Sequence, residues 1–366
     1  RFSMSKAAEL ANLIGNINAG GGGVNRNVII NGAMNVAQRG TSEADISNSG
    51  YYVCDRWRIA TNTSGRATMT QDSSAPQGFA NSTKLACTTA DTSIASDELF
   101  IFQQRIEGQN VQHFAKGTSG AKPITVSFYV KGNASATYTA ELEDSDNTRY
   151  NSQAFSVTTD WTRVTKTFVA DTTGTLDDDN AVSFRLNIWL HAGSQFSSGT
   201  HTSNAWHTTE AQRIADGTSS ILDSTSRTFF ITGVQLEVGQ NPTEFETEPF
   251  ERTLLKCSRY FQQVTTGENN GPIALATAYN SAQLSVPIPL RPEMRATPTV
   301  DIDTGSNYYR FTSNASNTNF DDIAFDIGTR QAVIVAKGSL SGMTGGQAGY
   351  FFTKSTSARL AFNAEL

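Results

Sequence analysis

Apolar and polar residues alternate along much of the chain from Val28 onward. The alternation is clearest over residues 182–191, where Phe184, Leu186 and Ile188 fall on one face of a strand and mostly polar side chains fall on the other. A period of two is that of a half-buried β-strand. Similar segments recur along the chain, with Gly, Asn and Asp between them. This pattern predicts an all-β protein built as a two-sheet sandwich or jelly roll.

The alternation also suggests how the chain divides. We expect a jelly-roll β-sandwich body over residues 27–248, a connecting helix over 249–262 and a smaller β-rich C-terminal tip domain over 263–366. Before the connecting helix, Phe230, Val234 and Leu236 are expected on one strand face. In the tip domain, Pro287 and Pro289 interrupt an alternating segment, which predicts an edge strand because proline donates no hydrogen bond to a neighbouring strand.

The N-terminal region has a different pattern. Residues 1–18 predict a short helix with an apolar stripe made by Leu10, Leu13, Ile14 and Ile17. A helix of this length is unstable alone in water, so its stripe needs a partner surface. The glycine-rich residues 19–26 predict a flexible hinge. We therefore expect the helix to act as an anchor.

Composition narrows the possible partners. The 366 residues carry a net charge of −6 and only 17% charged side chains, which argues against a nucleic-acid partner. No apolar run is long enough to cross a membrane, so no membrane insertion is expected. No signal peptide is visible, which suggests assembly inside a cell or release by lysis. Buried free thiols are expected at Cys54, Cys87 and Cys257, with a Cys54–Cys87 disulfide as the alternative.

The sequence contains no familiar catalytic motif, and we expect no enzyme activity. Glu141, Glu143, Asp144 and Asp146 follow a predicted strand. Paired carboxylates hydrolyse glycosidic bonds in many enzymes. Acidic residues at strand ends are more often exposed, and a solvated turn is expected here.

Metal ligation is weakly indicated. Asp177, Asp178 and Asp179 offer oxygen ligands in a turn, which suits Ca²⁺, although no following Glu completes the site. Three histidines, His191, His201 and His207, lie close together in sequence but at spacings that fit no zinc motif, so polar loop histidines are expected. No cofactor is predicted.

Sugar recognition calls for aromatic rings on an otherwise polar strand face. Trp189 meets this requirement, because Asn187 and Arg185 share its face. Weaker candidates are Tyr129, Trp206, Tyr308 and Tyr309. The alternative for Trp189 is that a loop, a second sheet or a neighbouring subunit covers its ring. Trp57 shares a face with Ile59 and is expected in the core.

Three segments resemble phage tail-fibre and receptor-binding proteins, especially those of marine phages. They are MSKAAELANLIGN at residues 4–16, NVIINGAMNVAQRGTS at 27–42 with CDRW at 54–57, and ITGVQLEVGQNPTEFETEPFERTLLKCSRYF at 231–261. The segment ITVSFYVKG at 124–132 looks like a carbohydrate-binding-module jelly roll, and LRPEMRATPTV at 290–300 is similar to tail-fibre tip domains.

The resemblance implies a homotrimeric tail fibre on a virion, assembled in the host cytoplasm. Its N-terminal helix would bind other phage tail proteins, and the fibre would recognise a host-surface polysaccharide. Two alternatives remain, a carbohydrate-binding module of a secreted bacterial protein and a virion-associated depolymerase.

Overall fold

A computed structural model describes residues 25–265, 267–314 and 316–366. The chain divides into two compact units, Arg1–Phe250 together with Leu366, and Glu251–Glu365. The predicted anchor helix, with its stripe of Leu10, Leu13, Ile14 and Ile17, lies outside the described residues, as does most of the predicted hinge.

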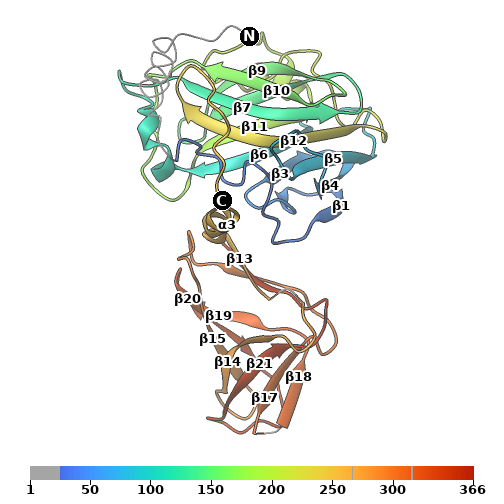
Figure 1. Cartoon of the computed structure of the whole chain (residues 1–366), viewed down its shortest axis with the longest axis vertical. Coiled ribbons are helices and arrows are strands. Elements are labelled where there is room, and N and C mark those ends of the chain that lie inside the picture. Colours follow the sequence, from blue (N-terminus) through green and yellow to red (C-terminus); the bar gives the residue numbers. More distant parts are fainter. Residues whose placement is uncertain (1–24, 266, 315) are drawn as a thin grey trace. The chain divides into compact units, whose positions relative to one another are not determined.

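The first unit is a jelly-roll β-sandwich, as the alternation predicts (Figure 1). One six-stranded sheet has the order β1 (Ser42–Ile46), β4 (Arg66–Asp72), β5 (Ser82–Thr89), β12 (Thr228–Val238), β7 (Ile124–Gly132) and β10 (Thr162–Phe168). The other has the order β2 (Gly50–Tyr51), β3 (Arg58–Asn62), β6 (Leu99–Glu107), β11 (Val182–Ala192), β8 (Ala136–Asp144) and β9 (Arg149–Val157). Short helical turns are η1 (Gly108–Asn110), η2 (Gln112–Phe114), α2 (Ser194–Ser197) and η3 (Glu210–Gln212).

The inner faces of the two sheets enclose one apolar core. Phe184, Leu186 and Ile188 of β11 are fully buried in it, as predicted. Trp57 is also fully buried and stacks on Phe102, with ring centroids 4.5 Å apart. The three cysteines are free and buried, as expected.

One expectation about β12 is wrong. Phe229 and Val234 both face the core, although five positions separate them, because the pairing of β12 with β7 shifts register at Gly233. Gly233 has φ +62°, which glycine adopts readily, and the bulge inserts an extra residue into the strand. Phe230 therefore lies on the outer face of the sheet and does not share a face with Val234.

The second unit begins within helix α3 (Phe250–Ser258). A three-stranded sheet has the order β13 (Phe261–Thr265), β22 (Leu360–Asn363) and β16 (Thr299–Ile302). A seven-stranded sheet has the order β18 (Ser316–Phe320), β17 (Tyr309–Ser313), β21 (Ala348–Thr353), β14 (Pro272–Ala278), β15 (Leu284–Pro289), β20 (Ala332–Lys337) and β19 (Ala324–Gly328). Within the described ranges, no helix of the chain has the length and apolar character needed to span a membrane.

The expected edge position of Pro287 and Pro289 is also wrong, because β15 lies between β14 and β20. The pairing with β20 runs along the whole of β15. The pairing with β14 involves only Leu284 and Ser285. Beyond Ser285, β15 pairs only with β20 among the described residues, so the missing N–H groups of the prolines remove no hydrogen bond from the sheet.

Candidate functional site

Two rows of polar side chains cross the outer face of the sheet that contains β11. Directly opposed residues on neighbouring strands form the first row, which runs Tyr51, Arg58, Gln103, Asn187, Glu141 and Ser152. The second row runs Arg105, Arg185, Glu143 and Tyr150. Side chains on this face alternate with those of the core, as the period of a strand requires. We call these two rows the polar face.

Hydrogen bonds run along the polar face. Arg105 Nε donates to Gln103 Oε1 at 2.9 Å, and Gln103 Nε2 donates to Asn187 Oδ1 at 3.3 Å. Asn187 Nδ2 in turn donates to the carboxylates of Glu141 and Glu143, both at 2.8 Å. A chain of this kind fixes the orientation of each amide, since an amide that accepts on one side must donate on the other.

One end of the polar face is closed by the segment that follows β11. Arg213, from this segment, forms ion pairs with Glu141 at 2.6 Å and with Glu143 at 3.0 Å. Its guanidinium lies over the ring of Tyr150, 4.0 Å from the centroid. Burial lowers the pKa of Arg213, but the two carboxylates outweigh burial and raise it.

Trp189 lies beneath this segment and not on an open surface. Its side chain is fully buried, packs against Phe196 and Ile214, and donates from Nε1 to Glu141 at 3.1 Å. Of the two alternatives for Trp189, the structure shows the covered ring, with a loop of the same chain as the cover. Trp189 and the equally buried Asn187 thus hold the face in place, and the covered indole ring of Trp189 cannot stack on a sugar.

The expected solvated acidic turn is wrong for three of its four residues. Glu141, Glu143 and Asp144 are buried, the first two against Arg213. Asp144 forms an ion pair with Lys116. Buried carboxylates need such partners, because an unpaired charge is strongly disfavoured away from water.

The other end of the polar face is cationic. Arg58, Arg105 and Arg185 are half-buried there, and Arg185 forms one ion pair, with Glu143 at 2.9 Å. Burial, followed by the charges of Arg58 and Arg185, lowers the pKa of Arg105 to about 10. Burial and the charge of Arg185 likewise lower the pKa of Arg58. The face with its cover has four guanidinium groups and two carboxylates, an excess of two positive charges on a chain that is acidic overall.

The sequence singled out Arg185 but missed Arg58 and Arg105. Both alternate with apolar residues in the segments RWRI and FIFQQRI, which marks them as outer-face positions. The pairing of β3, β6 and β11, which is needed to bring the three arginines together, joins residues far apart in sequence.

Tyr129 lies on the outer face of the opposite sheet and is not part of the polar face. It is half-buried and packs against Phe79, with ring centroids 5.4 Å apart. On the same sheet, Lys131 lies over the rings of Phe230 at 4.7 Å and Trp161 at 5.3 Å. Lys131 and the half-buried rings of Phe230 and Trp161 together form an aromatic surface on this sheet. The sequence did not indicate this surface, because the bulge in β12 moves Phe230 to the outer face.

The remaining aromatic candidates belong mainly to the protein interior. Trp206 packs against the core of the first unit, and its Nε1 donates to the backbone of Val169 at 2.8 Å. In the second unit Tyr309 is fully buried, and its hydroxyl donates to backbone carbonyl oxygens. Tyr308 is half-buried and does not line the neighbouring polar pocket of about 430 Å³, whose lining includes Asn307 and Lys354.

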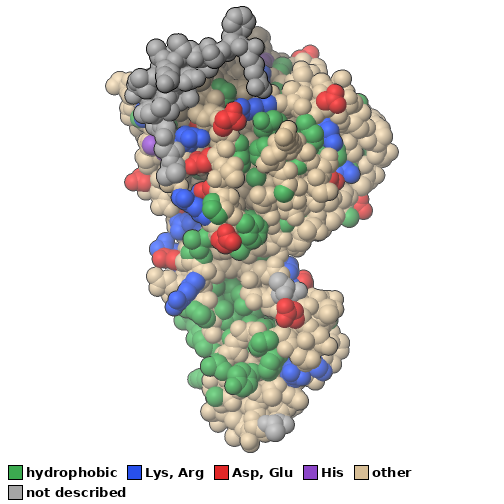
Figure 2. Space-filling view, viewed as in Figure 1, with side chains coloured by type: hydrophobic (Ala, Val, Ile, Leu, Met, Phe, Trp, Pro, Cys, Tyr) green, Lys and Arg blue, Asp and Glu red, His purple; other side chains and the backbone are tan. Residues whose placement is uncertain are grey.

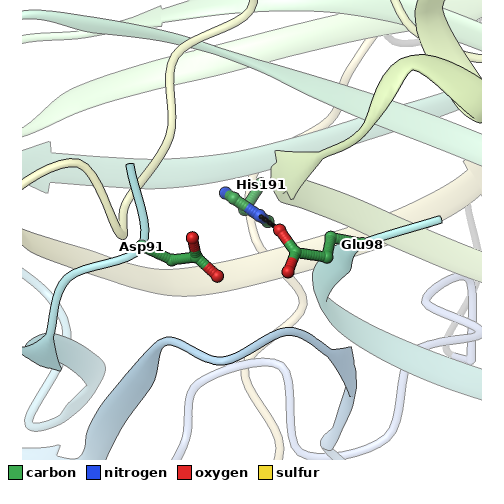
Figure 3. Close-up of side chains that lie close together, drawn as sticks. All are labelled: Asp91, Glu98 and His191. Atoms are coloured by element: carbon green, nitrogen blue, oxygen red, sulfur yellow. Dashed lines mark ion pairs between the residues drawn. The ribbon is translucent and has the colours of Figure 1, made fainter. Parts of the chain in front are cut away.

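The suggested calcium ligands Asp177, Asp178 and Asp179 are exposed in a loop, and no convergence of three ligand atoms involves them in the described part of the chain. The three histidines do not converge either. His201 contacts Ser152 at 2.9 Å. His191 is buried on β11, contrary to the expectation of a loop histidine, and lies beside two acidic residues, Asp91 and Glu98 (Figure 3).

No protein-family model and no curated protein matches the chain. Among solved structures, one described as CBM4 is 14% identical, covers 57% of this chain and 97% of its own, and has a TM-score of 0.29. The family 11 carbohydrate-binding module from Clostridium thermocellum, in complex with a β-1,3-1,4-mixed-linked tetrasaccharide, is 10% identical, with coverages of 56% and 98% and a TM-score of 0.28. Tailspike protein 4 of bacteriophage CBA120 is 12% identical, with coverages of 58% and 21% and a TM-score of 0.29. At these TM-scores the likeness does not indicate what this chain binds.

Proposed function

We propose that the chain is a non-catalytic, tail-fibre-type adhesin that binds an acidic polysaccharide of a host surface through Arg58, Arg105 and Arg185. It attaches to other tail proteins by its N-terminal segment and works as a homotrimer in the virion. The attachment and the virion follow from the sequence resemblance.

The cationic end of the polar face is the observation that carries the acidic ligand. Three half-buried guanidinium groups lie together there, and only Arg185 forms an ion pair, with Glu143, among the described residues. Burial and the neighbouring guanidinium charges lower the pKa values of Arg58 and Arg105. Guanidinium groups bind carboxylates and sulfates in bidentate geometry, and their partial burial strengthens that attraction. Arg105 Nη1 donates to the backbone oxygen of Leu366 at 3.0 Å, and a uronate or sulfated sugar would supply further negative charge to this group. Tyr51 lies in the adjoining row; its hydroxyl donates to the backbone oxygen of Leu366 at 3.0 Å and can still accept a hydrogen bond from a sugar hydroxyl.

The second unit provides a surface for self-association. Leu275, Tyr279, Ile327 and Tyr350 are 57 to 72% exposed. Leu275 and Tyr350 lie directly opposite each other on β14 and β21. Figure 2 shows hydrophobic side chains gathered on this unit. Exposed apolar side chains in such number mark a contact surface, and a second and third copy of the chain are the proposed occupants.

Affinity electrophoresis through gels that contain polysaccharide tests the acidic ligand. Alginate and a sulfated polysaccharide are expected to retard the protein, while dextran, which is neutral, leaves its mobility unchanged. Added salt should weaken the retardation because it screens the charges. Equal retardation by dextran would show that the face does not select acidic sugars.

The same polysaccharides distinguish the alternative functions. An adhesin leaves the chain length of the bound polysaccharide unchanged, whereas a depolymerase releases new reducing ends. Detection of reducing ends in proportion to protein concentration would contradict the non-catalytic proposal. Binding without self-association, at micromolar protein, would favour a carbohydrate-binding module over a fibre.

A further inference from the structure

Asp91, Glu98 and His191 form a compact cluster at one end of β11 (Figure 3). Asp91 comes from the connection between β5 and β6, Glu98 directly precedes β6, and His191 lies near the end of β11. One potential ligand atom from each residue lies within 4.8 Å of the others. The carboxylate of Glu98 is 13% exposed, which leaves a path from solvent to the cluster.

The His191 ring presents an unsatisfied nitrogen to this cluster. Its Nδ1 contacts the Ser220 hydroxyl at 2.7 Å, while its buried Nε2 makes no hydrogen bond. The nearest carboxylate oxygen, of Glu98, is 3.6 Å from Nε2, which is too far for a hydrogen bond. When Nδ1 donates to Ser220, the lone pair of Nε2 faces the carboxylates, and this arrangement suits a cation between them.

We propose that Asp91, Glu98 and His191 bind one divalent transition-metal ion, for which Zn²⁺ is the best fit. An imidazole nitrogen favours zinc over Ca²⁺ or Mg²⁺, which prefer oxygen ligands. Ligands of tetrahedral zinc lie roughly 3.3 Å apart, so the cluster closes on the ion by small side-chain movements. The ion would join the β5–β6 connection to β11 and so stabilise the end of the sheet that also holds Trp189.

Isothermal titration calorimetry of full-length, tag-free, metal-stripped protein with ZnCl₂ tests the site. We expect one ion per chain and a rise of several degrees in the melting temperature of the first unit, since a ligand that binds only the folded state stabilises it. CaCl₂ should give no comparable heat. Glu98→Gln and His191→Gln should each weaken zinc binding at least tenfold, whereas Asp97→Asn, an exposed neighbour outside the cluster, should bind like the wild type.

Two results would overturn the site. One is the absence of zinc binding to micromolar wild-type protein at zinc concentrations up to 100-fold above that of the protein. The other is wild-type affinity in the Glu98→Gln variant, which retains the fold because its side chain lies near the surface. That variant decides the question even where His191→Gln fails to fold.

Discussion

Arg105 on β6 and Arg185 on β11 lie directly opposite each other across an antiparallel strand pair. Like charges in this position destabilise a sheet. Their repulsion is one reason for the low pKa of Arg105, after burial and the charge of Arg58. Perturbed charges gathered on one face are typical of binding sites. The pair is thus expected to reduce the stability of the free protein, and a bound anion would offset this repulsion.

Replacement of Arg105 tests this relationship without any ligand. Arg105→Gln should leave the free energy of unfolding within about 0.5 kcal/mol of the wild-type value, because removal of the repulsion offsets loss of the hydrogen bond from Arg105 Nη1 to Leu366. Urea denaturation at low salt measures the effect. Arg163→Gln is the matched control on the opposite sheet. The Arg163→Gln variant loses hydrogen bonds to Thr243 and Ser127, so its free energy of unfolding should be lower than that of the wild type by about 1 kcal/mol. A cost above about 1 kcal/mol for Arg105→Gln would mean that this arginine stabilises the free protein.

The outer face of β11 illustrates how far the sequence leads. Alternation alone places Arg185, Asn187 and Trp189 on one face, and the structure confirms that placement. It does not reveal that residues of the following segment, such as Phe196 and Arg213, close over Trp189. Such coverage depends on contacts between segments, which no local pattern records.

Backbone irregularities account for other differences. The bulge at Gly233 shifts the alternation of β12 by one residue, and this moves Phe230 from the expected core to the surface. A glycine within a strand is compatible with either a bulge or a regular strand. A second irregularity is the incomplete pairing of β14 with β15, which explains why Pro287 is tolerated inside a sheet.

Glu141 should contribute strongly to the stability of the first unit. Its buried carboxylate accepts hydrogen bonds from Arg213, Asn187 and Trp189. Glu141→Gln keeps the shape and removes the charge, which leaves Arg213 undercompensated, and should lower the free energy of unfolding by about 3 kcal/mol. Glu210→Gln, at an exposed position, should change it by less than about 0.5 kcal/mol. Similar free energies of unfolding for the two variants in chemical denaturation would show that the buried ion pair does not stabilise the segment that covers Trp189.

Acidification should weaken the first unit. Burial is the main factor that lowers the pKa of each of its histidines, His113, His191, His201 and His207. The unfolded chain, with histidine pKa values near 6.5, then binds more protons than the folded one. This stability is therefore complete above about pH 6.5 and is lost as the pH falls below it.

Guanidinium denaturation between pH 7.5 and 5.5, in buffer with a chelator, measures this dependence. His201→Gln should reduce the slope of the free energy of unfolding against pH, because it removes one of the histidines that contribute to this dependence. A free energy of unfolding that stays level or increases toward pH 5.5 is the result that burial of these histidines does not allow.

Self-association should depend on the exposed apolar residues of the second unit. The double substitution of Leu275→Ser and Tyr350→Ser removes two opposed side chains of β14 and β21 and should convert trimers into monomers. Val169→Ser, which removes an exposed apolar side chain of the first unit, should leave the trimer intact. Mass photometry distinguishes the two masses directly. Trimers that persist in the double variant would place the subunit interface elsewhere.

The central claim is that Arg58, Arg105 and Arg185 bind an acidic glycan, and a calorimetric titration with alginate oligosaccharides tests it most directly. The wild type should bind with an affinity that falls as salt increases, and Arg105→Gln and Arg185→Gln should each weaken binding by at least tenfold, the loss expected when a charged hydrogen bond is removed. Arg163→Gln should retain wild-type affinity. Binding that is unchanged in the Arg105 and Arg185 variants, or reduced equally by Arg163→Gln, would contradict the account.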